Sequence, residues 1–184
     1  MLNRREFVIT GIAAGLLPVP SLAHRSSFRL DDKYLPQTVP FEGYEPNTIV
    51  VDPRNRFLYF VERRGEARRY GVGVGRAGLA WRGRAIVGRK AKWPRWTPTR
   101  NMIRREPGKY ARFANGVPGG PSNPLGARAL YLFKDGRDTM YRIHGTNQPS
   151  SIGRAVSNGC IRMFNKHVIE LFERVPMGTK VVVL

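Results

Sequence analysis

Two residues with the chemistry for acyl transfer stand sixteen positions apart in the C-terminal quarter of the chain. They are Cys160, the only cysteine, and His144, one of three histidines. A thiol is a strong nucleophile only as a thiolate, and its ordinary pKa of about 8.5 must be lowered by a nearby imidazole or by backbone N–H groups. Gly159 lets the backbone turn sharply before the cysteine. The pair predicts attack on a carbonyl, while a buried structural cysteine and histidine remain the alternative.

The first 23 residues have the pattern of an export signal. Residues 4–7 are Arg-Arg-Glu-Phe, residues 8–17 form an apolar run, and residues 21–23 are Ser-Leu-Ala, which suits a signal peptidase. The apolar run is about half as long as the roughly 20 residues that span a membrane. The paired arginines resemble a twin-arginine signal. We therefore expect an exported protein, in which a lone cysteine has no internal disulfide partner and is a candidate reactive thiol.

The chain is strongly basic, with a formal charge of +19 over 184 residues. Removal of the signal, which carries a net +1, would leave +18. Such a charge attracts polyanions. The arginines are dispersed and form no block or motif typical of nucleic-acid binding, so we expect an anionic cell envelope and not nucleic acid as the partner.

The elements that must position Cys160 and His144 are mostly β-strands. Residues 24–47 have no clear period and predict an extended, partly disordered lead-in, whereas residues 48–184 predict one domain. A hairpin ending at Ile143 would deliver His144 at a strand end, and the loop 145–156 must fold back to bring Cys160 near it. The helix predicted at about 166–175 follows Asn165, a candidate cap. The predicted strands cover residues 48–52, 57–61, 67–74, 85–88, 129–133, 139–143 and 179–184.

Three glycines, Gly73, Gly75 and Gly78, match the dinucleotide fingerprint G-x-G-x-x-G. That motif binds a cofactor only where it opens a helix and where an acidic residue follows about 20 positions later. Neither condition holds, because no helical period follows and no Asp or Glu lies near Pro98. We therefore predict no nucleotide cofactor and assign the glycines to strand ends and turns.

A long irregular section, about residues 89–126, is rich in proline, glycine and aromatic residues. Connections of this length are commonly functional. We interpret it as a cleft wall with Trp93 and Trp96 as apolar contacts; simple packing of both tryptophans onto the sheet is the alternative. A short helix within 102–110 is expected, limited by Pro107 and Gly108.

His144-Gly-Thr146, the sixteen-residue interval and Ser157-Asn-Gly-Cys-Ile-Arg162 together resemble the catalytic motif of the L,D-transpeptidase (YkuD-type) family. The segments 93–98, 118–128 and 175–183 are similar to exported Gram-negative members, so the resemblance covers residues 48–184. It implies a mostly β, sandwich-like catalytic domain with long loops, located in the periplasm and active in peptidoglycan synthesis, cell-wall biogenesis and cell shape.

The resemblance also implies roles for named residues. Cys160 would form a thioester with a stem tetrapeptide, releasing D-Ala, and the amine of a second diaminopimelate would take the acyl group to give a 3→3 cross-link. His144 would be the base, with its ring oriented by the Gly145 carbonyl. No metal or other cofactor is implied, and a monomer is expected. Backbone N–H groups of Asn158, Gly159 and Cys160 would form the oxyanion hole, and Arg162, Ser157 and Trp96 would contact substrate.

One position departs from the family pattern, because Asn158 stands where a second histidine is common. The family's base is the upstream histidine, kept here as His144, so we expect activity with an altered rate or pH dependence. Three alternatives remain open: an L,D-carboxypeptidase with water as acceptor, attachment of an envelope protein to the wall through a lysine, and a non-catalytic wall-binding protein.

Overall fold

A computed structural model describes residues 28–184. The predicted export signal, residues 1–23, lies outside the described residues. Strands dominate the described chain, which confirms the mostly β prediction. They are β1 (Gln37–Pro40), β2 (Thr48–Asp52), β3 (Phe57–Arg63), β4 (Glu66–Gly75), β5 (Gly83–Lys92), β6 (Arg128–Lys134), β7 (Arg137–His144), β8 (Ala155–Ser157), β9 (Ile161–Met163) and β10 (Lys180–Val183).

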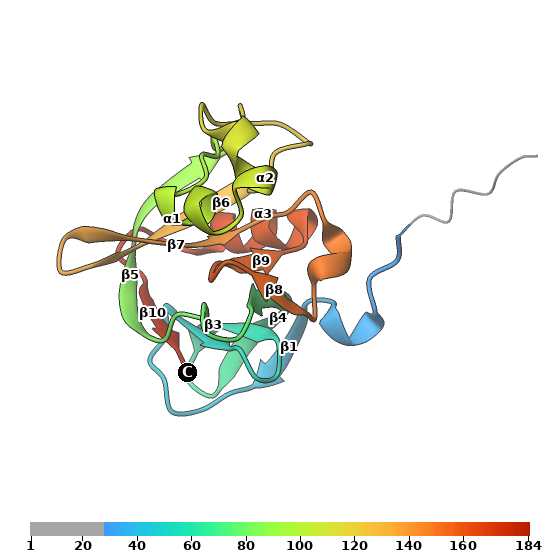
Figure 1. Cartoon of the computed structure of the whole chain (residues 1–184). Coiled ribbons are helices and arrows are strands. Elements are labelled where there is room, and N and C mark those ends of the chain that lie inside the picture. Colours follow the sequence, from blue (N-terminus) through green and yellow to red (C-terminus); the bar gives the residue numbers. More distant parts are fainter. Residues whose placement is uncertain (1–27) are drawn as a thin grey trace, which may run out of the picture.

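The strands form one sheet that closes on itself. Its order is β1-β4-β3-β2-β10-β5-β6-β7-β9, and β9 pairs in turn with β4, through Val72↔Met163 and Gly73↔Arg162. This barrel-like arrangement differs from the predicted sandwich, because a single curled sheet encloses the core in place of two facing sheets (Figure 1). The closing contact lies directly beside the segment that carries Cys160.

The core fills the barrel with side chains that alternate along its strands. Ile49 and Val51 of β2 point inward, as do Val181 and Val183 of β10. The helix α3 (Asn165–Arg174) packs Val168 and Leu171 into the same cluster, and Val175, its C-cap, joins them. It matches the predicted helix to within a residue at each end, because its apolar face follows a helical period.

Two short helices and a 3₁₀ turn lie within the long connection between β5 and β6. They are α1 (Arg100–Arg105), α2 (Pro107–Tyr110) and η2 (Ala111–Phe113), and we call residues 100–113 the cap. Pro107, expected to limit a helix, begins the second one, as its fixed φ allows. Figure 1 shows α1 and α2 grouped at the end of the molecule opposite β1 and β3.

The lead-in is more ordered than the sequence indicates. Its residues 32–34 form the 3₁₀ turn η1, and β1 adds an antiparallel edge strand to β4, with Gln37 opposite Arg69 and Pro40 opposite Glu66. A four-residue edge strand that follows Pro36 and ends at Pro40 has too little amphipathic pattern to be recognised in the sequence. Residues 37–40 of the extended lead-in are therefore part of the sheet.

Candidate active site

Strand pairing brings the predicted nucleophile and base to one cleft. Strands β7 and β9 pair in parallel, with Ile143 opposite Ile161 and His144 opposite Arg162. Cys160 immediately precedes β9, so its side chain emerges beside the end of β7. Both Cys160 and His144 line a cleft of about 530 Å³, which the cap borders on one side.

The His144 ring is fixed in position and in tautomer. Its Nδ1 lies 2.6 Å from the Gly145 carbonyl oxygen, the contact that the resemblance implies. A carbonyl oxygen only accepts hydrogen bonds, so Nδ1 carries the proton and Nε2 is left as a proton acceptor. Burial, reinforced by the charge of Arg162, lowers the pKa of His144 to about 3. The imidazole is therefore neutral across the ordinary pH range, as a general base requires.

The Cys160 thiol is protonated at rest. Burial raises its pKa, and the hydrogen bond from the Arg142 backbone N–H with the charges of Arg142 and Arg162 only partly opposes that effect. The sulfur also lies 3.9 Å from the Met140 carbonyl oxygen. The expectation that its surroundings lower the thiol pKa is therefore wrong. A neutral thiol beside a neutral imidazole must lose its proton as it attacks.

The loop before Cys160 is braced by its own hydrogen bonds. Ser157 Oγ donates to the Cys160 carbonyl oxygen at 2.6 Å and accepts from the Gly159 N–H at 3.1 Å. Gly159 has a φ of +120°, and a Cβ there would lie 2.5 Å from the Tyr141 ring, so only glycine fits. Of the three expected oxyanion donors, the Gly159 N–H is thus bonded within the loop. Those of Asn158 and Cys160 are the other two candidates.

Asn158 joins this loop to the cap. Its Nδ2 donates to the Tyr110 hydroxyl at 2.9 Å, and Arg105 Nη2 donates to its Oδ1 at 3.3 Å. The cap is held at a second point, where Arg76 Nη2 lies 2.7 Å from Glu106 Oε1. The side chain that departs from the family pattern therefore connects the nucleophile loop with the wall of the cleft.

The two other predicted substrate contacts, Arg162 and Trp96, also line the cleft. Arg162 Nη1 donates to Gln148 Oε1 at 3.3 Å, and burial lowers the pKa of its guanidinium. Trp96 packs edge-on against Tyr110 and Phe113, with ring centroids 6.3 and 5.8 Å apart. The tryptophan thus shapes the cap and contributes to the cleft surface at the same time.

A positioning residue that the sequence did not reveal is Asn165. The sequence predicts that Asn165 caps α3, but the N-cap is Phe164, and Asn165 is the first helical residue. Its Oδ1 instead accepts the backbone N–H groups of Ala127 (3.1 Å) and Thr146 (3.2 Å). A Cβ at Gly145 would lie 2.2 Å from the same oxygen, so glycine is required next to His144. No sequence signal links Asn165 to these loops, because the three segments meet only in the folded chain.

The glycine fingerprint has a structural role. Gly73 and Gly75 lie in β4, and a turn follows them instead of a helix. A Cβ at Gly73 would lie 2.5 Å from the Ser151 carbonyl oxygen, and one at Gly75 would lie 2.9 Å from the Cα of Gly159. Gly73 therefore lets β4 approach Ser151, and Gly75 lets it approach the nucleophile loop. Among residues 28–184, no helix is long and apolar enough to cross a bilayer.

Comparison with known proteins identifies a family. The profile described as "L,D-transpeptidase catalytic domain" (YkuD) matches residues 46–183. "Probable L,D-transpeptidase ErfK/SrfK" of Escherichia coli is 36% identical over 165 residues, which cover 83% of this chain and 52% of that protein. The chain thus spans about half the length of this and several other curated relatives that it matches.

Two solved structures are also similar. One, titled "Probable carnitine operon oxidoreductase" from Brucella melitensis, is 56% identical, has a TM-score of 0.59, and is covered over 96% of its chain by 84% of this one. The other, an L,D-transpeptidase from Mycobacterium smegmatis, is 18% identical with a TM-score of 0.52, over 74% of this chain and 58% of that one. The second likeness supports the fold alone.

Proposed function

This chain belongs to the YkuD-type L,D-transpeptidase catalytic domain family, and on that premise we propose that it is an exported peptidoglycan L,D-transpeptidase acting in cell-wall synthesis. The observation that carries the proposal is the cleft in which Cys160 and a tautomer-fixed His144 lie together. The oxidoreductase title of the Brucella structure finds no support here, since Gly73 and Gly75 of the apparent dinucleotide fingerprint lie in β4, where they allow close packing against Ser151 and Gly159, and no helix follows them.

The geometry supports a two-step acyl transfer. As the Cys160 sulfur attacks the carbonyl between the L-centre of diaminopimelate and D-Ala, His144 Nε2 takes the thiol proton. The tetrahedral oxyanion accepts hydrogen bonds from the backbone N–H groups of Asn158 and Cys160, with that of Gly159 available only if it leaves Ser157. Collapse of the intermediate breaks the C–N bond, His144 returns the proton to the leaving amine, and D-Ala departs.

The second step restores the enzyme. The side-chain amine of another diaminopimelate attacks the thioester and gives its proton to His144, and the C–S bond breaks to form the 3→3 cross-link. Cys160 leaves as a thiolate and is reprotonated by His144. In this scheme Arg162 holds a substrate carboxylate, and Trp96 with the cap covers the apolar part of the stem.

We further propose that residues 1–23 direct export by a twin-arginine route to the periplasm, that residues 24–47 precede the catalytic domain at 48–184, and that the monomer acts on stem peptides of the anionic envelope. Incubation of the mature protein with purified disaccharide-tetrapeptide, with products identified by mass, tests the reaction. A cross-linked dimer with loss of D-Ala is expected from the parent protein, and neither is expected from the Cys160→Ala variant.

The same experiment separates the alternatives, because the acceptor is part of the product. A tripeptide without cross-link would identify an L,D-carboxypeptidase. When an envelope protein is added to the incubation, an amide-linked stem peptide on one of its lysines would identify attachment to the wall. Release of D-Ala by the Cys160→Ala variant would contradict the mechanism. Well-folded parent protein that forms no covalent adduct with a carbapenem at Cys160 would instead indicate a non-catalytic wall-binding protein.

A further inference from the structure

A second hollow, of about 580 Å³, lies on the outer face of the barrel and shares no lining residue with the Cys160 cleft. Its floor comes from the outward-facing positions of β2, β10 and β5. In the register of these strands, Lys180 lies opposite Thr48 and Ile86, and Val182 lies opposite Arg84. The floor therefore combines apolar side chains with two cations on one diagonal, a spacing of about 7–8 Å between Cα atoms.

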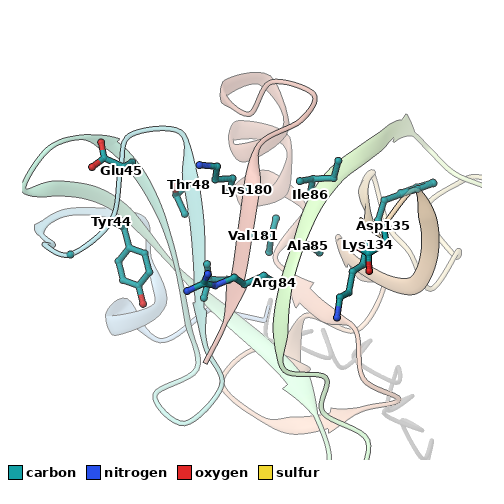
Figure 2. A pocket seen from close by; sticks show the side chains of 13 residues that line it. Tyr44, Glu45, Thr48, Arg84, Ala85, Ile86, Lys134, Asp135, Lys180 and Val181 are labelled. Carbon is teal, nitrogen blue, oxygen red and sulfur yellow. The ribbon is translucent and has the colours of Figure 1, made fainter.

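The walls of this groove come from two loops that approach from opposite sides. Residues 43–45 before β2 form one wall, and residues 133–135 at the turn between β6 and β7 form the other. Figure 2 shows Tyr44 on one side, Lys134 and Asp135 on the other, and Arg84 between them. The Phe133 ring adds an apolar edge, since it covers Gly88, where a Cβ would lie 2.5 Å from the ring.

Three of the residues that line the groove are cations. In the part of the chain that the structure describes, none of Arg84, Lys134 and Lys180 forms an ion pair. Of the two carboxylates that line it, Glu45 lies 3.5 Å from Arg64, outside the groove lining. The other, Asp135, forms no ion pair among residues 28–184, so three unpaired cations line the groove with one unpaired carboxylate and its net charge is positive.

The solvent-exposed part of the groove floor also contains apolar surface. Ile86, opposite Lys180 in the strand register, exposes 45% of its surface, the kind of exposure that a ligand would cover. A ligand that fits has several carboxylates to meet the cations and small apolar groups to meet Ile86 and Val182. A stem peptide of the wall polymer, which carries both carboxylates and alanine methyl groups, has this chemistry.

We propose that this groove is a second, non-catalytic binding site for a carboxylate-bearing stem peptide of the wall polymer. The identity of the peptide rests on the proposed function, whereas the site itself rests on the groove. A stem held here anchors the enzyme to the polymer while another stem enters the Cys160 cleft. Two sites on one polymer raise the effective concentration at the cleft without adding any contact to the reacting stem.

The test compares polymer binding with turnover of a small substrate. The triple variant Arg84→Gln, Lys134→Gln, Lys180→Gln removes the three cations at exposed positions. We expect it to bind insoluble purified wall polymer about tenfold more weakly in a sedimentation assay, since exposed charge contacts are individually weak but act together. D-Ala release from soluble disaccharide-tetrapeptide should stay within about twofold of the parent rate, because that substrate needs the cleft alone.

A matched control removes equal charge elsewhere. Arg54→Gln, Arg154→Gln, Lys166→Gln changes three exposed cations that line neither hollow. Polymer binding that stays within about twofold of the parent supports the groove, whereas equal weakening in both triple variants would show that diffuse charge holds the polymer and would overturn the proposal. The variant Ile86→Glu puts a carboxylate in the floor and should weaken polymer binding at least as much as the groove triple variant.

Two further outcomes are decisive. If the groove variants lose binding to anionic phospholipid vesicles but keep binding to wall polymer, the groove is a membrane site and the proposal is wrong. If the parent protein releases no D-Ala while the groove variants still lose polymer binding, the proposed function fails and the groove survives. The Cys160→Ala variant should bind polymer as the parent does.

Discussion

The two hollows of this molecule differ in how their polar groups are held. In the cleft, the polar side chains are hydrogen-bonded within the protein: His144 to Gly145, Ser157 to the nucleophile loop, and Asn158 to the cap. In the groove, Arg84, Lys134 and Lys180 have no ion-pair partner among residues 28–184. Bond-making requires groups fixed to within fractions of an ångström, whereas retention of a charged polymer requires only unpaired charge.

The largest expected effect comes from the reacting pair. We expect Cys160→Ala to abolish D-Ala release and carbapenem acylation, and His144→Ala to reduce both by about 10³-fold, a typical value for loss of a general base. Polymer sedimentation should not change in either variant, because the groove is untouched. Loss of polymer binding with loss of the thiol would show that the cleft, and not the groove, retains the protein.

The next effect tests the two hydrogen bonds by which Asn165 holds the backbone at Ala127 and Thr146, next to His144. Asn165→Ala leaves the buried N–H groups of Ala127 and Thr146 without their acceptor, and we expect a loss of about 2 kcal/mol in unfolding free energy. Displacement of His144 should lower D-Ala release by about 30-fold, since small misplacements are costly in catalysis. Denaturant unfolding and soluble-substrate kinetics measure the two effects.

Asn165→Asp is the matched control, because a carboxylate oxygen accepts the same two N–H groups. It should recover most of the stability, and its negative charge should raise the pKa of His144 and move the acidic limb of the pH profile upward. If Asn165→Ala and Asn165→Asp lower stability and D-Ala release equally, the proposed role of these two hydrogen bonds is wrong. Neither substitution should alter the groove, which shares no residue with this part of the chain.

The role of Asn165 is one of the features that could not be predicted from the sequence. Strands such as β2 and β6, the helix α3 and the convergence of Cys160 with His144 were predictable, because periodicity and a specific local motif determine them. Sheet closure through β4 and β9 was not, since β9 has only three residues and its partner lies some 90 positions earlier in the chain. The raised Cys160 pKa depends on burial, which only the folded chain provides.

The contact between Asn158 and the cap should have a smaller effect. We expect Asn158→Ala to reduce kcat for D-Ala release by about tenfold and Tyr110→Phe by about threefold, because the first loses two hydrogen bonds and the second loses one. Melting temperature should change little in the second variant.

Asn158→Asp supplies the conservative comparison for this contact. A carboxylate can accept from both Arg105 and the Tyr110 hydroxyl, so it should restore most of kcat. Full activity of Asn158→Ala would show that the cap needs no such connection. A change in polymer binding by these variants would mean that the cap, and not the groove alone, touches the polymer.

The smallest expected effect on activity is that of pH between 5 and 8. With the pKa of His144 near 3, its protonation does not begin in this range, so the cleft should not respond. Carbapenem acylation should therefore be flat from pH 8 to 5 as far as His144 is concerned, and a loss centred near pH 6.5 would contradict the buried, neutral imidazole.

The free energy of unfolding, by contrast, should fall as the pH drops below about 6.5. His144 contributes at most about 1.4 kcal/mol per pH unit, because the unfolded chain then binds a proton that folded His144 excludes until the pH approaches 3. A variant His144→Gln should lose that part of the slope in denaturant unfolding measured at pH 4 to 7, and an unchanged slope would show that other groups, such as His167 with its burial-lowered pKa, account for the acid sensitivity.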